Sequence, residues 1–285
     1  MWVNKDKNTA LFSITNTQDL INILIPIFDK RNLNTTKYLD YLLFKEILLI
    51  CIKKEHLTKS GLIKIENLRS QLNTNRTEFK FPVNHIINIT PYWLLGFLEG
   101  DGSFTIGHTK PKKFYCQFTI SLTESQRPVL EKIKIFIDKM GINQLNYDLP
   151  TPIDRCSINF RKSRSQSQKG QYALIISDIY FIYHYFIPFL IELSFFTKKG
   201  LDFNDWVIGI NILVKGLHLI EQGKNLILEI ISSMNSNRLS AEASNIYNHS
   251  TLHEKYTSPE QIGTFPSDPF LKNQYSQLLS FPQKI

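Results

Sequence analysis

The chain has 285 residues, 42% of them hydrophobic and 12% aromatic, which suits one or two globular domains with a sizeable core. A formal net charge of +8 and a pI near 9.2 favour a polyanionic partner such as nucleic acid, although an ordinary basic protein can carry the same charge. Three scattered cysteines argue against a disulfide framework or a zinc site and fit a reducing compartment. No secretory signal or bilayer-spanning stretch is visible, so we expect no membrane partner.

The first third of the chain predicts a strand at 8–13, a helix at 18–29 and a pair of helices between Leu39 and Arg76. A short His-Leu step joins the helices of the pair, and apolar residues recur at helical spacing along the second of them. Residues 77–89 then have the composition of a linker.

The pattern of this helix pair occurs a second time, and 39–76 matches 201–238 without a gap. The matched residues lie at a constant distance of 162, because His218, Gly223, Asn235 and Arg238 correspond to His56, Gly61, Asn73 and Arg76. Solenoid repeats have periods of roughly 20–50 residues, so a distance this long predicts a duplicated domain.

The second copy has a front half that the first lacks. Its predicted elements are a helix at 92–99, strands at 103–109 and 114–123, a helix at 126–140, strands at 155–162 and 171–177, and a helix at 178–193. This order of helices and strands, extended by the helix pair, predicts an α+β fold. We expect a truncated first copy at 1–76 that begins at its last strand, a linker at 77–89, a complete second copy at 90–240 and a weakly ordered tail at 241–285.

The segment 93–104, WLLGFLEGDGSF, has the pattern of a site that binds a metal ion. Gly96 and Gly100 are spaced so that a second helix can approach closely, and Gly102 permits a sharp turn from helix into strand. Asp101 stands at that turn, where its carboxylate can share a divalent cation with a carboxylate from the partner helix. Carboxylate and phosphate oxygens suit Mg²⁺, which can activate water and stabilise the leaving oxygen during phosphodiester hydrolysis.

This segment resembles the signature of the LAGLIDADG homing endonucleases, whose nine positions fall on 94–102. The order of elements, the Leu-Asp steps at 39–40 and 201–202 and the Asn-x-Asn-Arg ends extend the resemblance to the two-repeat, single-chain members encoded in fungal mitochondrial introns. The resemblance implies αββαββα modules with a curved antiparallel sheet, one copy complete and one represented by its C-terminal part. It also implies a Mg²⁺-dependent enzyme of the mitochondrion that cuts double-stranded DNA at specific sites.

The resemblance also implies roles for single residues. Asp101 takes the position of the metal-binding, catalytic carboxylate, and Glu99 takes an earlier acidic position that is more often structural. Lys199 falls where the family places a basic residue beside the scissile phosphates, with Lys37 as its counterpart; a solvated charge at a helix start is the alternative for both. Thr119 lies near a position at which relatives carry a polar residue that organises water.

Polar and basic residues alternate along the predicted strands, so one face of the sheet can read base edges in a DNA groove, whereas a merely solvated face is the alternative. The candidates are Ser103, Thr105, Gln117, Thr119, Arg155, Asn159 and Arg161. Basic loop residues are expected to contact phosphates, and these are Lys110, Lys112, Lys113, Lys162, Arg164 and Lys169. His56 and His218 are expected to be hydrogen-bonded or capping residues without catalytic roles.

The first copy has no counterpart of Asp101, so the second metal carboxylate is missing from this sequence. Three explanations remain open: a fragment or exon-fused product that an upstream portion completes, a degenerate remnant, or pairing of two chains through their 93–102 helices. Besides a DNA endonuclease, the sequence is compatible with a maturase that binds intron RNA on the same fold, or with an inactive relic.

Overall fold

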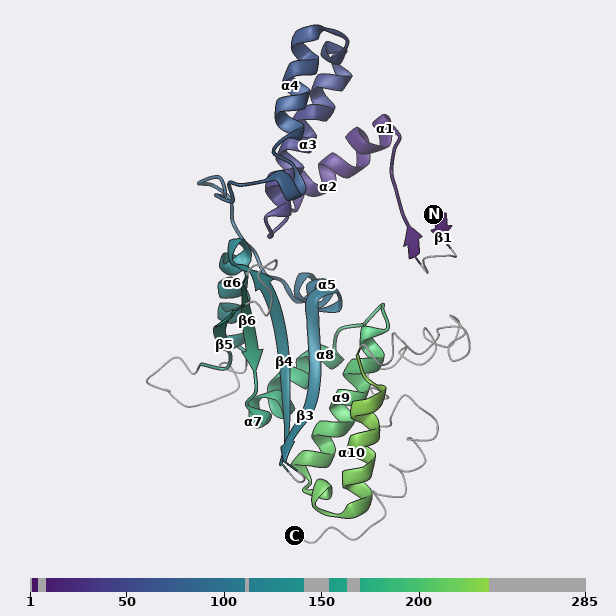
Figure 1. Ribbon diagram of the computed structural model, residues 1–285, viewed down its shortest axis with the longest axis vertical. Helices are drawn as coiled ribbons and strands as arrows, with labels where there is room; N and C mark the ends of the chain where they lie inside the picture. Colours follow the sequence, from purple (N-terminus) through teal and green to yellow (C-terminus); the bar gives the residue numbers. More distant parts are fainter. Residues whose placement is uncertain (1, 5–8, 111–112, 141–153, 163–169, 236–285) are drawn as a thin grey trace. The chain divides into compact units, whose positions relative to one another are not determined.

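The computed structural model describes residues 2–4, 9–110, 113–140, 154–162 and 170–235. The chain forms two compact units, 1–88 and 89–285, each of which is described by itself (Figure 1). The boundary falls at the end of the predicted linker, and the predicted tail at 241–285 lies outside the described residues. Within the described ranges, no helix has both the length and the apolar character that a bilayer span requires.

The second unit is built on a four-stranded antiparallel sheet with the strand order β3-β4-β6-β5. The predicted order αββαββα and the α+β class are confirmed, and two further helices follow. The elements are α5 (Pro91–Asp101), β3 (Gly102–Lys110), β4 (Lys113–Thr123), α6 (Arg127–Asp138), β5 (Ser157–Arg161), β6 (Gln171–Ile176), α7 (Ile179–Phe181), α8 (Ile187–Ile191), α9 (Lys199–Val214) and α10 (Glu221–Ser233).

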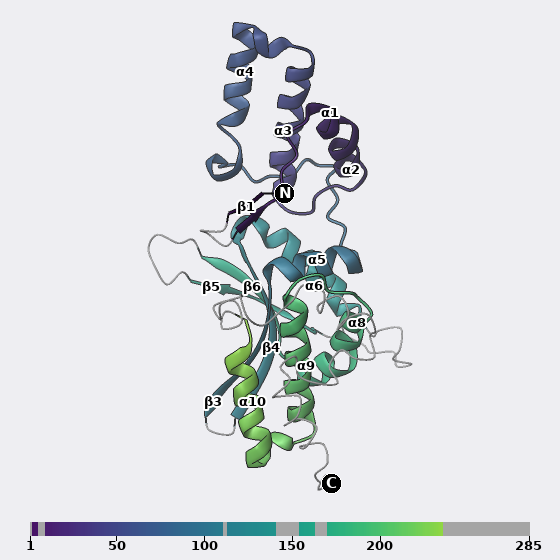
Figure 2. The ribbon, with the colours of Figure 1, turned by 90° about the vertical axis from the view of Figure 1, so that its right-hand side faces the viewer.

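The sheet is twisted (Figure 2). It has one apolar face and one polar face, because successive side chains on a strand point to opposite sides. Phe104 on β3 lies opposite Phe118 on β4, and Phe118 packs against Phe186 from the helical segment after β6. Each such ring is worth about 1.5–3 kcal/mol when fully buried. The buried side chains of the apolar face are Phe104, Ile106, Cys116, Phe118, Ile120, Leu174 and Ile176. The polar face therefore points away from the helical layer.

Helices α9 and α10 run beside β3, the edge strand of the sheet (Figure 1). The indole Nε1 of Trp206 donates to the carbonyl of Thr105 at 3.2 Å, and the side-chain amide of Asn235 donates to the carbonyl of Phe104 at 2.9 Å. Gly209 leaves room for Ile106, whose Cδ1 would lie 2.1 Å from a Cβ added at this glycine. The helix pair thus satisfies and covers an edge that would otherwise be open to pairing with another strand.

The first unit repeats the helices of the second unit at the predicted distance of 162 residues. Its elements are β1 (Trp2–Asn4), β2 (Thr9–Leu11), α1 (Thr17–Asp19), α2 (Ile25–Lys30), α3 (Lys37–Ile52) and α4 (Lys59–Arg69). Helices α1, α2, α3 and α4 begin 162 residues before α7, α8, α9 and α10, respectively. Asn73 and Asn235, which follow the two helix pairs, both have the left-handed conformation, with φ of 53° and 56°. The structure therefore bears out the duplication that the sequence indicated.

The first copy begins one strand earlier than the sequence predicted. The structure contains β1 in addition to β2, and Asn4 pairs with Thr9 in β2 as Arg161 pairs with Gln171 in β6. Thr9 and Gln171 are 162 residues apart, so the β1–β2 hairpin is the counterpart of the β5–β6 hairpin. Its first strand escaped prediction because three residues are too few to show the alternation of a strand.

Both units contain a turn of π-helix at equivalent positions, Leu20–Leu24 and Ile182–Phe186. Each turn is followed by an Ile-Pro step whose proline, Pro26 or Pro188, has no backbone N–H to donate to a carbonyl four residues earlier. Widening the helix by one residue relieves the clash of the proline ring with that carbonyl and removes the need for the missing hydrogen bond.

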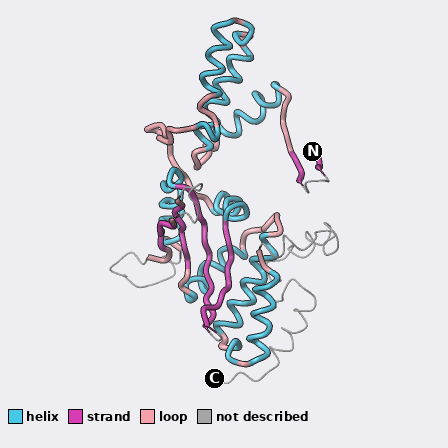
Figure 3. The backbone as a smooth tube through the Cα atoms, viewed as in Figure 1, coloured by secondary structure: helices cyan, strands magenta, loops and turns pink. Residues whose placement is uncertain are grey.

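The predicted linker has no helix or strand after Arg76 and lies as a loop before α5 (Figure 3). It nevertheless packs onto the first unit. The side-chain amide of Asn34 donates to the carbonyl of Asn88 at 2.7 Å, and its oxygen accepts from the N–H of Asn88 at 2.9 Å. The ring of His85 stacks on Phe81 and on Tyr38, with centroid distances of 4.5 and 4.2 Å.

Two repeat-related glycines allow helices α4 and α10 to cross the turns that precede them. A Cβ at Gly61 would lie 2.0 Å from the carbonyl oxygen of Glu55, and a Cβ at Gly223 would lie 2.0 Å from that of Leu217.

Because backbone atoms cannot move aside cheaply, we expect Gly61→Ala or Gly223→Ala to lower the free energy of unfolding by about 2–3 kcal/mol. Urea unfolding measures the loss. Gly96→Ala is the control, since a Cβ there meets no heavy atom within 4 Å, and this exposed helical position should gain about 0.5–1 kcal/mol. Losses of equal size at Gly96 and Gly223 would contradict the steric explanation.

The half-buried imidazole of His85 is expected to make the first unit sensitive to acid. Burial lowers its pKa, and within the described residues neither ring nitrogen has a hydrogen-bond partner. The unfolded chain therefore binds the proton more readily, and the contribution of His85 to stability, complete above pH 6.5, falls as the pH drops towards the folded pKa. Hydrogen exchange of α3 amides between pH 7.5 and 5.5 measures this loss. His85→Phe keeps the stacking and should remove the pH dependence in this window; an unchanged slope would assign it to another group.

Candidate metal and nucleic-acid site

Helix α5 places Asp101 at the junction between the apolar core and the polar face of the sheet. The hydroxyl of Thr90 accepts from the N–H of Trp93 and caps the helix, and Pro91 occupies its first position. At the other end, a Cβ on Gly102 would lie 2.5 Å from the carbonyl oxygen of Leu98, so only glycine fits the turn into β3. Asp101 is exposed, and among the described residues its carboxylate has no ion pair or hydrogen bond. It is available to a ligand.

The glycine stripe of α5 is open in the second unit. Gly96 and Gly100 are exposed, and within the described residues a Cβ at either would meet no heavy atom within 4 Å. The rings of Trp93 and Phe97 stack beside them at 4.8 Å. A surface of glycines and aromatic rings suits close packing of a second helix, and the helix interface expected at Gly96, Glu99, Gly100 and Gly102 stays a prediction.

Glu99 connects α5 to the segment that leads into α9. Its Oε1 accepts hydrogen bonds from the N–H groups of Phe196 and Thr197, each at 2.8 Å. Lys199, half-buried, is the first residue of α9 and follows this anchored segment, while its own N–H is held by the Thr197 hydroxyl at 3.2 Å. The structural role expected for Glu99 therefore has a concrete form: it ties the start of the Lys199 helix to the end of the motif helix.

Removing the Glu99 carboxylate should loosen the start of α9. We expect Glu99→Ala to lower the free energy of unfolding by about 1–2 kcal/mol, because two hydrogen bonds to a charged but partly solvated acceptor are lost. Glu99→Gln retains an acceptor and should lose less. Hydrogen exchange at the Phe196 and Thr197 amides reports the contact directly, and unchanged protection of both amides in the alanine variant would count against it.

The polar face of the sheet brings together most of the residues predicted to contact base edges. Ser103 pairs with Thr119 and Thr105 pairs with Gln117 across β3 and β4, while Asn159 and Arg161 are exposed on β5. Thr119 differs from the others, because it is only 6% exposed and its Oγ1 has no hydrogen-bond partner among the described residues. Its hydroxyl is thus free to bind water or a ligand at the centre of the face.

Arg155 does not belong to this polar face, in contrast to the prediction. Strand β5 begins at Ser157, and the Arg155 guanidinium lies over the rings of Phe181 and Tyr185 at 5.3 and 5.8 Å. Its backbone N–H donates to Asp138 at 2.9 Å. Alternation assigned it to the strand, whereas cation–π packing against the helical layer determines its position.

The predicted phosphate contacts lie only partly within the described residues. Lys113 begins β4 and Lys162 follows β5, and both are exposed. Lys110 ends β3, where its backbone pairs with Lys113. Lys112, Arg164 and Lys169 lie outside the described residues.

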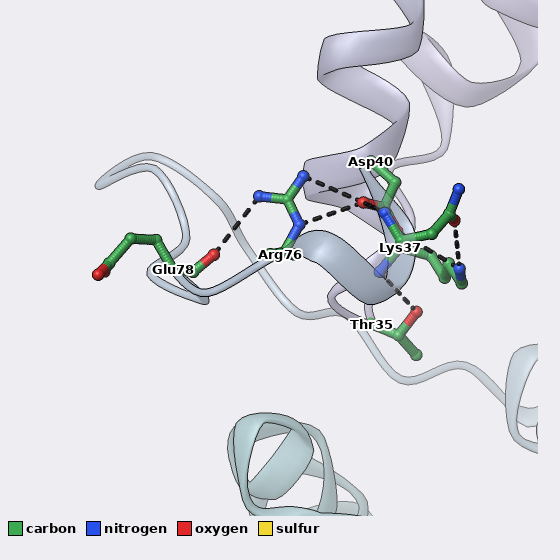
Figure 4. Close-up of polar contacts among 6 residues, drawn as sticks. Thr35, Lys37, Asp40, Arg76 and Glu78 are labelled. Atoms are coloured by element: carbon green, nitrogen blue, oxygen red, sulfur yellow. Dashed lines mark hydrogen bonds and ion pairs between the residues drawn. The ribbon is translucent and has the colours of Figure 1, made fainter. Parts of the chain in front are cut away.

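Lys37, the counterpart of Lys199, takes part in a structural network in the first unit (Figure 4). Its Nζ contacts Asp40 at 3.4 Å and the side-chain oxygen of Asn73 at 3.0 Å. Asp40 also accepts from the N–H of Asn73 and from Arg76, which closes the helix pair. Partial burial would raise the pKa of Asp40, but these hydrogen bonds outweigh it and hold the pKa below its usual range. The Asp202 carboxylate accepts from the N–H of Asn235 in the same way in the second unit.

Prediction from sequence missed the function of Asp40 and Asp202, although the aspartate recurs at the repeat distance. A closing contact with a residue 33 positions away has no local signal.

His56 and His218 lie in the short turns between helices, where each buried Nδ1 has no hydrogen-bond partner among the described residues. The hydrogen bonds expected for these histidines are therefore not present there.

The described residues contain no group of three or more His, Cys, Asp and Glu side chains that could hold a metal ion by themselves. Asp101 fits one position in the shell of a hard cation, since its carboxylate is exposed and unpaired. The other positions would need oxygens from outside the described residues, such as DNA phosphates and a carboxylate on a partner helix.

Comparisons with known proteins agree with this arrangement. The sequence model described as LAGLIDADG endonuclease matches residues 2–48 and 94–210, more than half of the chain. The chain is 27% identical to the uncharacterized mitochondrial protein RF1 of Saccharomyces cerevisiae, covering 82% of this chain and 49% of the relative. It is also 27% identical to the probable intron-encoded endonuclease 2 of Neurospora crassa, covering 80% of this chain and 51% of the relative. The chain thus spans about half the length of these relatives.

Solved structures with the same fold are LAGLIDADG homing endonucleases. I-SmaMI bound to cleaved DNA is 26% identical, with a TM-score of 0.63 and coverage of 78% of this chain and 73% of that chain. I-LtrWI bound to target DNA is 25% identical, with a TM-score of 0.67 and coverage of 83% and 78%. The mitochondrial and intron-encoded relatives agree with the predicted mitochondrial location. The family match, the duplicated fold and the glycine-rich helix that ends in Asp101 lead to one conclusion: the chain belongs to the LAGLIDADG endonuclease family.

Proposed function

We propose that the chain forms the larger part of a site-specific homing endonuclease that hydrolyses phosphodiester bonds in double-stranded DNA with the help of Mg²⁺. The observation that carries this proposal is the exposed carboxylate of Asp101, which has no partner among the described residues and lies next to a polar sheet face. A carboxylate at the C-terminal end of a helix opposes the helix dipole, so this position costs stability and suggests a functional use. The printed names of endonuclease relatives and the DNA-bound neighbours support the same activity.

In this proposal each part of the second unit has one task. The polar face, with Ser103, Thr105 and Gln117, contacts base edges, while Lys113 and Lys162 contact phosphates. Asp101 would hold Mg²⁺, and the cation would supply charge stabilisation and activate water. Lys199 places positive charge beside the scissile phosphate, and Glu99 fixes the segment that carries it.

A complete site needs a second carboxylate, which we propose comes from a motif helix in an upstream portion. The two matched ranges repeat in part, since 2–48 corresponds to 164–210 at the repeat distance, whereas 94–163 has no counterpart in the first range. By itself, the chain is expected to bind duplex DNA and to nick one strand at most.

The experiment is a nicking and cleavage assay of the full chain with Mg²⁺ on duplex DNA that carries the intronless form of the flanking gene. Sequencing of the cut ends maps the site. Specific nicks in one strand support the proposal, as do paired cuts after the upstream portion is added. Tight binding of the intron transcript without any cut in the duplex would reject it and favour an RNA-binding maturase.

A further inference from the structure

The turn that joins α3 to α4 in the first unit exposes apolar and basic side chains together. We call residues 53–64 the basic tip. Leu57, Leu62 and Ile63 in this segment are 72%, 57% and 55% exposed, respectively. Figure 2 shows the turn at the end of the α3–α4 pair, with no other described element of the first unit beside it. The described residues of this unit therefore provide no cover for the three apolar side chains.

The geometry of α4 directs two of these side chains away from the helix pair. Gly61 is buried and Ile65 is half-buried, on the side of α4 that faces the preceding turn and α3. Successive residues are rotated by about 100° around a helix, so Leu62 and Ile63 point about 100° and 200° away from Gly61. They lie on the outer side of the helix and do not join the contact with α3.

The second unit shows that the fold does not require apolar residues at these positions. At the repeat distance of 162, Leu62 and Ile63 correspond to Lys224 and Asn225. Lys224 forms an ion pair with Glu221 at 3.7 Å, and Asn225 is exposed. The same turn thus presents polar side chains in one unit and apolar side chains in the other. The apolar surface is a property of the first turn alone.

The basic tip also carries more positive charge than its counterpart. It contains four lysines and one glutamate, whereas residues 215–226 contain two lysines and one glutamate. Lys53, Lys54 and Lys59 are exposed, and within the described part of the chain none of them forms an ion pair. Their charges are therefore available to an anionic partner.

Two of these lysines occupy positions that are unfavourable for folding. Lys54 has the left-handed conformation, with φ of 59°, at the position where the second unit has Gly216 with φ of 67°. Residues with a Cβ rarely adopt this conformation. Lys59 begins α4, where a positive charge opposes the helix dipole, and its counterpart Glu221 has the favourable sign. Lysine at both positions indicates a use for the charge at the surface.

Hydrogen bonds hold the turn in a defined shape. The hydroxyl of Thr58 donates to the carbonyl of Glu55 at 2.8 Å and accepts from the N–H of Gly61 at 3.0 Å. Leu57 lies between these bonded residues. Its exposure is therefore fixed by an ordered turn, and the surface is preorganised for a partner.

We propose that the basic tip docks on the surface of an anionic phospholipid bilayer. Leu57, Leu62 and Ile63 enter the boundary between headgroups and acyl chains, while the lysines around them contact lipid phosphates. The apolar stems of the lysines can follow the leucines into this boundary with their charged ends at the headgroups. The expectation of no membrane partner concerned segments that cross a bilayer, whereas this contact lies on one side of it.

Other partners fit the basic tip less well. Lysines suit the phosphates of a nucleic acid, but aliphatic side chains cannot stack on bases as aromatic rings do. A peptide helix needs an apolar groove and a peptide strand needs a sheet edge, whereas the tip is a turn between two helix ends. A bilayer surface accepts both kinds of side chain at once, because its charged headgroups lie directly above an apolar layer.

Flotation of the full chain with vesicles tests this inference. The vesicles contain equal parts of phosphatidylcholine and phosphatidylglycerol, and pure phosphatidylcholine vesicles are the comparison. We expect binding to the anionic vesicles to be about tenfold tighter or more. A parallel series contains excess duplex DNA, which occupies other basic surfaces of the chain, and binding to the anionic vesicles should persist there.

Three variants each introduce the residue that the second unit has at the same position. Ile63→Asn and Lys59→Glu should weaken vesicle binding by about fivefold or more, the first by removing apolar surface and the second by reversing a charge. Lys54→Gly should weaken it by about fivefold, and its thermal stability should stay equal or rise because glycine accepts the left-handed conformation. Weaker binding by a variant of equal or higher stability excludes unfolding as the cause.

Two matched controls separate the basic tip from the rest of the chain. Leu219→Ser removes a leucine that is 65% exposed in the equivalent turn of the second unit. Lys162→Glu makes the same change of charge as Lys59→Glu at an exposed position after β5. Both controls should bind the anionic vesicles as the parent does.

Equal losses in Lys59→Glu and Lys162→Glu would overturn the proposal, because vesicle binding would then follow net charge alone. Unchanged binding by Ile63→Asn would overturn it as well, and so would binding that duplex DNA abolishes. If the parent ignores vesicles and Ile63→Asn loses affinity for duplex DNA, the tip belongs to a nucleic-acid surface instead. None of these readouts involves DNA cleavage, so failure here is distinct from failure of the proposed endonuclease.

Discussion

Asp101→Asn is expected to reduce Mg²⁺-dependent nicking by roughly 10²-fold or more while DNA affinity changes little, because the amide cannot hold the cation with a negative oxygen. The variant should fold at least as well as the parent. Asp101 is the last residue of α5, where a negative charge opposes the helix dipole, and its removal should raise the free energy of unfolding by about 0.3–1 kcal/mol. A variant that is more stable than the parent but nicks DNA more slowly has lost a catalytic group and has kept its structure.

The measurement is single-turnover nicking against Mg²⁺ concentration, with thermal unfolding in parallel. Glu192→Gln is the matched control, because Glu192 is an exposed carboxylate at the end of α8 and the described residues give it no ion pair or hydrogen bond. It should share the small gain in stability and leave nicking unchanged. Nicking by Asp101→Asn at the parent rate would remove Asp101 from the metal site, and an equal loss in both variants would point to a general effect of charge on DNA binding.

The sequence predicted the parts of this fold that local periodicity determines. Helical spacing of apolar residues and the 162-residue distance predicted the helix pairs α3–α4 and α9–α10, because each helix buries one side against a neighbour. The second helix of each pair ends before the Asn-x-Asn-Arg segment, at Arg69 and Ser233. The turn at Gly102 was predictable for a similar reason, since only one residue type fits beside the carbonyl of Leu98.

Contacts between distant residues account for what the sequence did not reveal. The carboxylates of Asp40 and Asp202 close their helix pairs through residues 33 positions away, and nothing within a helical window indicates this. The position of Arg155 depends on rings that arrive from α7 and the adjacent π-helical turn. The same holds for the candidate site. The motif in the sequence predicted Asp101 at the end of α5, whereas the hydrogen bond between Glu99 and Phe196 joins residues 97 positions apart and could not be predicted from the motif.

Trp206→Ala is expected to cost the second unit about 3–5 kcal/mol, a larger loss of stability than removal of the Glu99 carboxylate should cause. The indole is fully buried, lies 5.0 Å from the ring of Phe104 and donates to the carbonyl of Thr105 at 3.2 Å. Truncation leaves a cavity between α9 and β3 and an edge carbonyl without its donor. Trp206→Phe keeps most of the volume but removes the indole donor. The difference in unfolding free energy between Trp206→Ala and Trp206→Phe therefore measures the cost of the cavity, and the difference between Trp206→Phe and the parent measures the cost of the lost hydrogen bond.

Phe44→Ala is the matched truncation in the first unit, at the same position of the repeat. Because Phe44 is partly exposed and covers no strand among the described residues of its unit, its loss should cost only about 1–2 kcal/mol. Urea unfolding followed by hydrogen exchange resolves the two units and measures both values. Equal costs at Trp206 and Phe44 would mean that the first unit already buries its helix pair.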